Sequence, residues 1–257
     1  GRTLTYGKLD DAVRRFAGGL AGRGIGPGSV VGIMAPNLPE YAVVFLGTAY
    51  AGAAVTTINP TYTAPEVHHQ LVDSEARLLV TVGAFLDTAR SGAEDTGVEA
   101  IFTLDSVEGV ESFGALLGEP LGEPVAVPLS ATVALPYSSG TTGLSKGVVL
   151  SHANLVANIV QVLAPLEIRP DETIMGVLPF FHIYGMQVLM NTGLRAGASI
   201  VTMPRFDLEQ FLQLHQDYRI TRSFVAPPII VALAKHPIVD NYDLSALEQV
   251  FSGAAPL

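Results

Sequence analysis

The sequence of 257 residues contains no cysteine, which excludes several kinds of site. Without thiols the chain has no disulfide framework, no thiolate metal centre and no cysteine nucleophile. A chain that needs no disulfides fits a reducing compartment, so we expect a cytoplasmic protein. No apolar run reaches the ~20 residues that a membrane-spanning helix needs, so we also expect no membrane span.

Charge is scarce too, and positive charge is the scarcer sign. Only 15% of the residues are charged, and 14 Lys and Arg stand against 24 Asp and Glu, for a formal net charge of −10. Binding to nucleic acid or to an anionic membrane needs a basic face, so we exclude both classes of partner. Hydrophobic residues make up 49% of the chain, which favours a large core and argues against disorder.

Short apolar runs alternate with segments of helical periodicity. This alternation predicts an α/β fold of repeated strand–helix units, with mostly parallel sheets and helices on both faces. The predicted strands of the first part cover residues 30–34, 53–58, 77–82 and 100–104. Those of the second part cover residues 132–137, 147–150, 173–180, 199–203, 220–226 and 247–253.

Two features bear on domain organisation. Residues 109–130 are rich in Gly, Pro and Glu and predict a connection between subdomains. The chain opens at Gly1 and stops at Leu257, directly after a predicted strand and turn. We therefore expect residues 1–257 to be part of a longer protein.

A polar loop separates the predicted strands 132–137 and 147–150. Its sequence, "YSSGTTGLSKGVVLSH", starts at Tyr137 and carries Lys146 as its only Lys, Arg, Asp or Glu, and no Asp or Glu occurs between residues 126 and 166. Glycines allow consecutive backbone N–H groups to point into one concavity, hydroxyls add donors, and the lysine adds a mobile positive charge. This combination is typical of a polyphosphate site. The alternative is a flexible surface loop with a solvated lysine.

The loop differs from the common P-loop of nucleotide-binding proteins. That motif ends in Gly-Lys-Ser/Thr and opens a helix. Here Ser145 precedes Lys146, Gly147 follows it, and the next residues are strand-like. The phosphates would therefore be wrapped by a hairpin-like loop and would not rest on a helix N-terminus.

Three stretches, in order, resemble one family. They are "YSSGTTGLSKGVVLSHANL" from Tyr137, "LPFFHIYG" at 178–185 and "FSGAAPL" at 251–257. The chain resembles the adenylate-forming enzymes, which include acyl-CoA synthetases, luciferases and adenylation domains of peptide synthetases. It is most similar to the 4-coumarate–CoA ligases and related bacterial acyl-CoA ligases, and the resemblance covers essentially the whole chain.

The resemblance implies an activity and its substrates. Such enzymes join a carboxylic acid to the α-phosphate of ATP, release pyrophosphate, and pass the acyl group to the thiol of coenzyme A. Magnesium ions accompany the ATP. The resemblance also implies that residues 1–257 are an incomplete N-terminal adenylation (AMP-binding) domain, with a C-terminal domain absent from this chain.

The resemblance further implies roles for single residues. The β- and γ-phosphates would be held by residues of the polar loop, namely Ser138, Ser139, Gly140, Thr141, Thr142, Gly143 and Lys146. His182 would face ATP and the substrate carboxylate, as a catalytic residue beside Lys146. Tyr184, Val188 and Ala254 would line the acyl site, and Arg205 would contact coenzyme A.

Other interpretations of these residues stay open. His182 could be a partly buried histidine in an aromatic cluster, Arg205 a surface cation, and Ala254 part of a plain turn. Val188 indicates a more apolar pocket than hydroxycinnamate ligases often have, so the acid is not named by the sequence. His68 and His69 are interpreted as surface or packing residues, because they have no metal-ligand partner at a useful spacing.

Rival functions remain as well. The chain could be a non-catalytic nucleotide-binding fragment, or a luciferase-like or peptide-synthetase-like adenylation enzyme. A P-loop phosphohydrolase is disfavoured by the residues that flank Lys146. The oligomeric state cannot be read from the sequence.

Overall fold

The computed structural model describes residues 2–138 and 145–254. Contacts divide the chain into two compact units: residues 1–35 with 39–155, and residues 36–38 with 156–257. Residues 109–130 all belong to the first unit. Within the described ranges, no helix is both long enough and apolar enough to cross a membrane.

The first unit is built on a mostly parallel sheet of seven strands, in the order β4-β3-β1-β2-β5-β6, with β7 also paired to β5. Five strands run parallel, and β6 and β7 run antiparallel to β5. The strands are β1 (Val30–Met34), β2 (Ala54–Thr57), β3 (Ala76–Thr81), β4 (Ala100–Thr103), β5 (Thr132–Ser138), β6 (Lys146–Gly147) and β7 (Leu150–Ser151).

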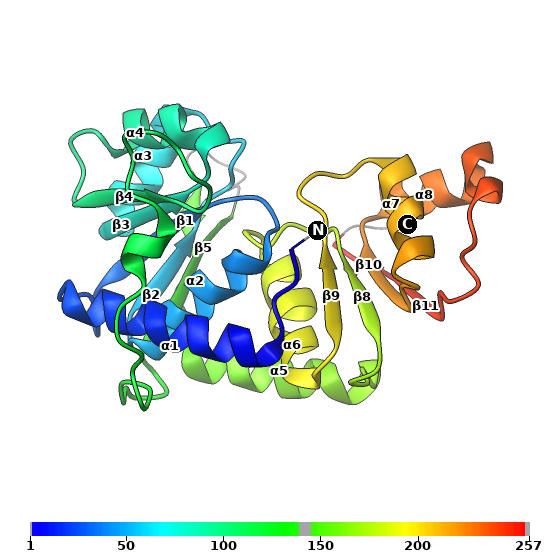
Figure 1. Cartoon of the computed structure of the whole chain (residues 1–257), viewed down its shortest axis with the longest axis horizontal. Coiled ribbons are helices and arrows are strands. Elements are labelled where there is room, and N and C mark those ends of the chain that lie inside the picture. The colour runs from blue at the N-terminus through cyan, green and yellow to red at the C-terminus, as the bar shows by residue number, and fades with distance from the viewer. Residues whose placement is uncertain (1, 139–144, 255–257) are drawn as a thin grey trace. The chain divides into compact units, whose positions relative to one another are not determined.

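Helices cover both faces of this sheet. The connection from β1 to β2 runs one way along the sheet, and the connections from β2 to β3 and from β3 to β4 run the other way. Right-handed crossovers therefore place their helices on opposite faces, as Figure 1 shows for α2 and for α3 and α4. The helices are α1 (Tyr6–Gly22), α2 (Pro39–Tyr50), α3 (Ala64–Asp73) and α4 (Leu86–Ala93), with short 3-10 turns η1 (Gly83–Phe85) and η2 (Phe113–Leu116).

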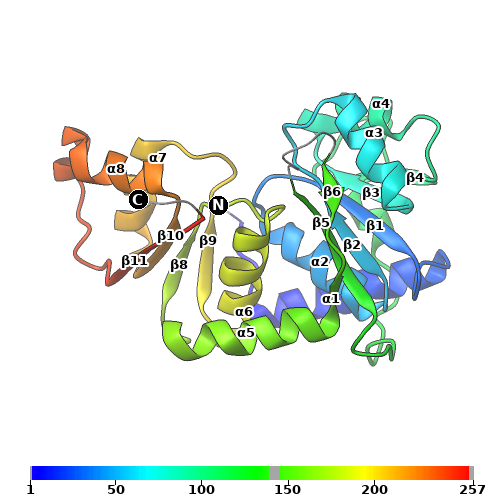
Figure 2. The same cartoon turned by 180° about the vertical axis from the view of Figure 1, so that it is seen from behind.

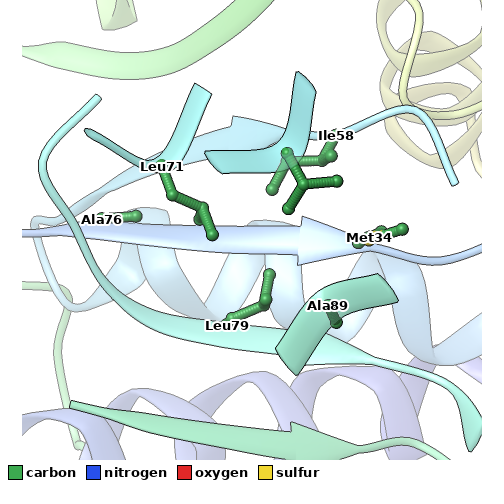
Figure 3. Packing of buried hydrophobic residues seen from close by; sticks show 7 residues of the cluster. Met34, Ile58, Leu71, Ala76, Leu79 and Ala89 are labelled. Atoms are coloured by element: carbon green, nitrogen blue, oxygen red, sulfur yellow. The ribbon is translucent and has the colours of Figure 1, made fainter. Parts of the chain in front are cut away.

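The core beneath α3 and α4 is fully buried. Apolar side chains from β1, α3, β3 and α4 converge there, as Figure 3 shows for the labelled residues. The cluster consists of Met34, Ile58, Val67, Leu71, Ala76, Leu79 and Ala89. Helix α3 therefore packs against the sheet with its buried side.

The second unit has a smaller sheet, in which four parallel strands follow the order β11-β10-β8-β9. These strands are β8 (Thr173–Gly176), β9 (Ser199–Thr202), β10 (Arg222–Val225) and β11 (Gln249–Ser252). Its helices are the π-helix η3 (Tyr184–Asn191), α6 (Thr192–Ala196), α7 (Leu208–Asp217), α8 (Pro227–Lys235) and the 3-10 turn η4 (Pro237–Asn241). Helix α5 (His152–Leu166) carries the chain from one unit into the next, and Figure 2 shows it from behind.

The predicted α/β fold with mostly parallel sheets is confirmed, but two predicted strands are wrong in extent. Residues 147–150 do not form one strand, because Val148 and Val149 are exposed between β6 and β7. The strand predicted at 173–180 ends at Gly176. In both places an apolar run suggested a buried strand that the surroundings do not support.

Asn37 explains the early end of β8. Its side-chain amide donates to the carbonyls of Gly176 (2.9 Å) and Leu178 (2.8 Å), and its Oδ1 accepts from the amide of Phe180 (2.8 Å). The carbonyl of Gly176 also accepts from the amide of Met203 (3.1 Å), as the last hydrogen bond toward β9, and beyond it Leu178 and Phe180 pair with the Asn37 side chain. Asn37 thus directs the segment that leads to His182.

We expect Asn37→Ala to destabilise the protein by about 2 kcal/mol, because it removes three hydrogen bonds in a buried place and the Gly176 carbonyl keeps only its bond from the amide of Met203. Urea unfolding followed by circular dichroism measures this. Asn241→Ala, in exposed η4, is the matched control and should change the free energy of unfolding by less than about 0.5 kcal/mol. An Asn37→Ala effect as small as the control's would contradict the role given to Asn37.

Candidate functional site

The polar loop leaves one strand and returns on its antiparallel partner. Residue Tyr137 of β5 pairs with Gly147 of β6, and Ser138 pairs with Lys146. Ser138 and Lys146 are both exposed, so their polar groups are accessible at the base of the loop. The hairpin predicted for this region is therefore present. The predicted site residues Ser139, Gly140, Thr141, Thr142 and Gly143 lie outside the described residues.

Helix α3 contacts the base of this hairpin. The Tyr137 hydroxyl donates to Oδ2 of Asp73 (2.5 Å), and burial together with this hydrogen bond raises the pKa of Tyr137. Nε2 of His69 lies 3.0 Å from the carbonyl oxygen of Ser145. His69 is therefore a packing residue, one of the two interpretations that the sequence left open, and its partners are Ser145 and Tyr137. The spacing of His69 and Asp73, one helical turn apart, was the signal that both face the same neighbour.

A cavity of about 610 Å³ opens in the second unit. Its wall brings together α5, the segment from residue 182 into η3, and the end of β11. The lining residues are Asn158, Gln161, Val162, Pro165, Leu166, His182, Ile183, Tyr184, Gln187, Val188, Phe251, Gly253 and Ala254. This wall, mostly apolar with a few polar groups, is typical of a small-molecule site.

Four residues singled out in the sequence meet in this wall. His182, Tyr184 and Val188 come from the segment after β8, and Ala254 comes from the segment after β11. Arg205 does not line the cavity, and it is exposed in the segment between β9 and α7. The α5 residues of the wall were not expected from the sequence.

His182 is oriented by its own backbone surroundings. Its amide donates to the carbonyl of Pro179 (3.1 Å), and its carbonyl accepts from Met186 (2.8 Å). Nδ1 of His182 accepts from the amide of Tyr184 (3.3 Å), so the neutral ring carries its proton on Nε2. The imidazole of His182 can therefore donate from Nε2 to an anionic oxygen.

The turn after His182 is tight and requires glycine at one position. A β-carbon on Gly185 would lie 2.1 Å from the carbonyl oxygen of Pro179, which is backbone and has little freedom to move. The chain then continues as the π-helix η3, a wide form of helix that is frequent at functional sites. Together these features place Tyr184 and Val188 in the same wall.

Tyr184 lines the cavity, but its hydroxyl oxygen is buried. Its hydroxyl has no hydrogen-bond partner among the described residues, and burial raises its pKa. The ring packs edge-on against Phe224, with centroids 6.4 Å apart. A β-carbon on Gly253 would lie 3.1 Å from the Tyr184 ring, so glycine there leaves room for it.

Backbone strain marks the other side of the wall. Ala254 has a φ of +74°, in the left-handed region that residues with a side chain seldom adopt. Strained backbone of this kind persists where the surrounding structure holds it, often at ligand sites. The small methyl group of Ala254 also leaves the cavity open at this point.

Three of the polar lining residues are carboxamides. Asn158 and Gln161 come from α5, and Gln187 comes from η3. Gln187 is buried, and its Oε1 accepts from the side-chain amide of Asn191 (3.0 Å). Amides both donate and accept, so the wall can meet polar atoms of a ligand without carrying charge.

No metal centre is formed by the side chains that the structure describes. Within residues 2–138 and 145–254, no group of three His, Asp or Glu side chains could hold a metal ion.

Comparison with known proteins assigns the sequence to a family. The sequence profile described as "AMP-binding enzyme" matches residues 1–257. The chain is 40% identical over 263 residues to 4-coumarate–CoA ligase 1 of Petroselinum crispum, covering 100% of this chain and 48% of the relative. It is 41% identical over 264 residues to 4-coumarate–CoA ligase 5 of Oryza sativa subsp. japonica, again with coverages of 100% and 48%.

Solved structures agree with the sequence relatives. A natural red-emitting luciferase from Phrixothrix hirtus superposes with a TM-score of 0.92 at 29% identity, over 100% of this chain and 51% of that chain. A long-chain-fatty-acid-CoA ligase from Archaeoglobus fulgidus superposes with a TM-score of 0.90 at 30% identity, over 98% and 51%. The chain thus spans about half the length of the curated relatives it matches. On the match of the family profile to its whole length, this chain belongs to the AMP-binding enzyme family.

Proposed function

We propose that the complete protein activates a carboxylic acid with ATP and transfers the acyl group to coenzyme A. In the first step a carboxylate oxygen attacks the α-phosphorus of ATP, the bond to the β-phosphate breaks, and pyrophosphate leaves. In the second step the thiol sulfur attacks the acyl carbon, the thiol proton is released, and AMP leaves. Neither step needs a nucleophile from the protein.

The observation that carries this proposal is the lining of the cavity. His182, Tyr184 and Val188 come from one segment and Ala254 from another that is far away in the sequence, yet all four share one wall. An apolar cavity suits the acyl chain, and a histidine whose neutral ring carries its proton on Nε2 suits the carboxylate. The 4-coumarate–CoA ligases at 40% identity support the same reaction.

The roles of the remaining residues are those that the resemblance to the family implies. Lys146 would neutralise phosphate charge from the exposed base of the polar loop, together with Ser138, Ser139, Gly140, Thr141, Thr142 and Gly143. Magnesium would arrive with ATP, and Arg205 would contact coenzyme A. Catalysis would then rest on positioning and on stabilisation of the developing charge.

The organisation of the protein belongs to the same proposal. Residues 1–257 would be the N-terminal part of an adenylation domain, and the remaining half of the relatives' length would correspond to further parts of the enzyme. Ser145, where the family usually has proline, leaves the loop base without the stiffness of a proline ring. We further propose a cytoplasmic location.

The test is a panel of acids with the complete protein. Aromatic, medium-chain and long-chain carboxylic acids are offered with ATP and magnesium, and pyrophosphate release is followed, with and without coenzyme A. The proposal expects release that depends on the acid, and a thioester only when coenzyme A is present. ATP binding without any acid-dependent release would favour a nucleotide-binding protein, and steady ATP hydrolysis without an acid would favour a phosphohydrolase.

For Lys146→Ala in the complete protein, we expect acid-dependent ATP–pyrophosphate exchange to slow by about 10²-fold. Losing one donor that faces developing charge has effects of this order, and backbone amides and magnesium would share the remaining charge. Lys8→Ala in α1 is the matched control and should leave the exchange rate unchanged. An unchanged rate in Lys146→Ala would remove the loop from the proposed site.

For Val188→Ser, we expect a shift of preference from aliphatic acids toward hydroxylated aromatic acids. The loss for aliphatic acids should be about 1 kcal/mol in kcat/KM, or roughly fivefold, because an apolar contact of about one methylene is lost. A matched series of acids measures the shift. Val231→Ser, on the exposed side of α8, is the control, and an unchanged ranking in Val188→Ser would place Val188 outside the acyl site.

A further inference from the structure

The polar loop is attached to helix α3 at its second end. The carbonyl oxygen of Ser145, the residue before Lys146, lies 3.0 Å from Nε2 of His69. A carbonyl oxygen can only accept, so the imidazole of His69 must donate and must carry a proton on Nε2. The contact joins residues 76 positions apart in the sequence.

The same helix also holds the first end of the loop. Asp73 lies one turn after His69 and accepts from the hydroxyl of Tyr137 in β5 (2.5 Å). The rings of His69 and Tyr137 meet edge-on, with centroids 6.4 Å apart and an interplanar angle of 89°. We call His69, Asp73 and Tyr137 the α3 brace. Through Tyr137 in β5 and through the contact of His69 with Ser145, just before β6, it joins α3 to both ends of the loop.

The Tyr137 ring in turn limits the position of β6. A β-carbon on Gly147 would lie 3.1 Å from Cζ of Tyr137, so the ring packs directly against this backbone. Strand β6 has only two residues, and both are exposed. The pairing with β5 continues after β6 through the amide of Val148, which donates to the carbonyl of Pro136 (2.8 Å), and through β7, whereas His69 and Asp73 add contacts at the end next to the loop.

Helix α3 is a firm base for such contacts. Its N-terminus carries a capping box between Thr63 and Glu66, and its buried side packs into the core. The side-chain amide of Gln70 donates to Thr56 Oγ1 (2.8 Å) and to the carbonyl of Thr57 (3.0 Å), both in β2. The brace therefore connects the loop base to the centre of the sheet.

The direction of Lys146 depends on the register of this short pair. In a strand, successive side chains point to opposite faces, so a slip of one residue would turn Lys146 to the other face. The hydrogen bond from His69 fixes the residue next to Lys146 and thereby opposes such a slip.

We propose that His69 is a positioning residue for Lys146, acting through the carbonyl of Ser145 to hold the base of the polar loop in the register that binds nucleotide phosphates. This inference rests on the proposed function of the loop. His69 itself need not touch the nucleotide. Its contribution is to keep Lys146 on one face of the hairpin before ATP arrives.

Three variants of the complete protein test the proposal. His69→Ala removes the donor, and His69→Gln retains an N–H donor at a similar reach. His68→Ala changes the neighbouring histidine, which makes no hydrogen bond to Ser138 or to residues 145–147, the part of the loop base that the structure describes. Hydrogen exchange without nucleotide, read on the peptide that covers residues 145–150, should accelerate in His69→Ala only.

Kinetics supply the second readout. The KM for ATP should rise about 2- to 12-fold in His69→Ala, the range expected for loss of one hydrogen bond, while the KM for the acid stays unchanged. His69→Gln should recover most of the loss, and His68→Ala should behave as the wild type. A purely structural role would shift both KM values or neither.

The outcomes separate the two proposals. Unchanged exchange and unchanged KM for ATP in His69→Ala would overturn the role of His69, and so would an equal effect of His68→Ala. A rise of both KM values would also overturn it, because that result indicates general destabilisation. If the wild-type protein bound no ATP, the proposed function would fail, whereas hydrogen exchange would still decide whether His69 holds the loop base.

Discussion

Parallel strand pairing is the constraint on which the candidate site depends. In a parallel sheet all strands end at the same edge, and ligands of open α/β folds bind beyond that edge. Four candidate residues lie at or after the carboxyl end of a strand: Ser138 closes β5, His182 follows β8, Arg205 follows β9 and Ala254 follows β11. Lys146 begins β6 and pairs with Ser138, at the same end of β5. The helical crossovers that make the sheets parallel therefore also bring the chemistry of each unit to one edge.

Single side chains then determine the path of the segments that follow the strands. Asn37 ends β8 by pairing with backbone groups of Gly176, Leu178 and Phe180, and this directs the segment that carries His182. Gly185 allows the backbone to turn against Pro179. In the first unit, His69 and Asp73 hold the base of the hairpin by contacts to Ser145 and Tyr137. In both units polar side chains from outside a segment decide where that segment goes.

The cavity combines an apolar wall with a few polar side chains. The amides of Asn158 and Gln161 and the imidazole of His182 supply polarity without fixed negative charge. Such a wall suits a ligand that is apolar along most of its length and anionic at one end. The strained backbone at Ala254 is consistent with a ligand-binding position, because such strain often occurs at ligand sites.

Much of this was accessible from the sequence, because its signals are local. Alternating apolar runs predicted the parallel sheets, and the glycines, hydroxyls and lysine between 137 and 147 predicted a hairpin-like loop. The strands predicted at 147–150 and 173–180 were wrong in extent, since an apolar run does not reveal that Val148 and Val149 face solvent or that Asn37 takes the backbone groups after Gly176. The His69–Ser145 contact and the α5 wall of the cavity were decided only by the tertiary structure. Those contacts join residues many positions apart, and the physical reason is that a hydrogen-bond partner or a cavity wall is chosen by distance in space, which local spacing along a chain does not encode.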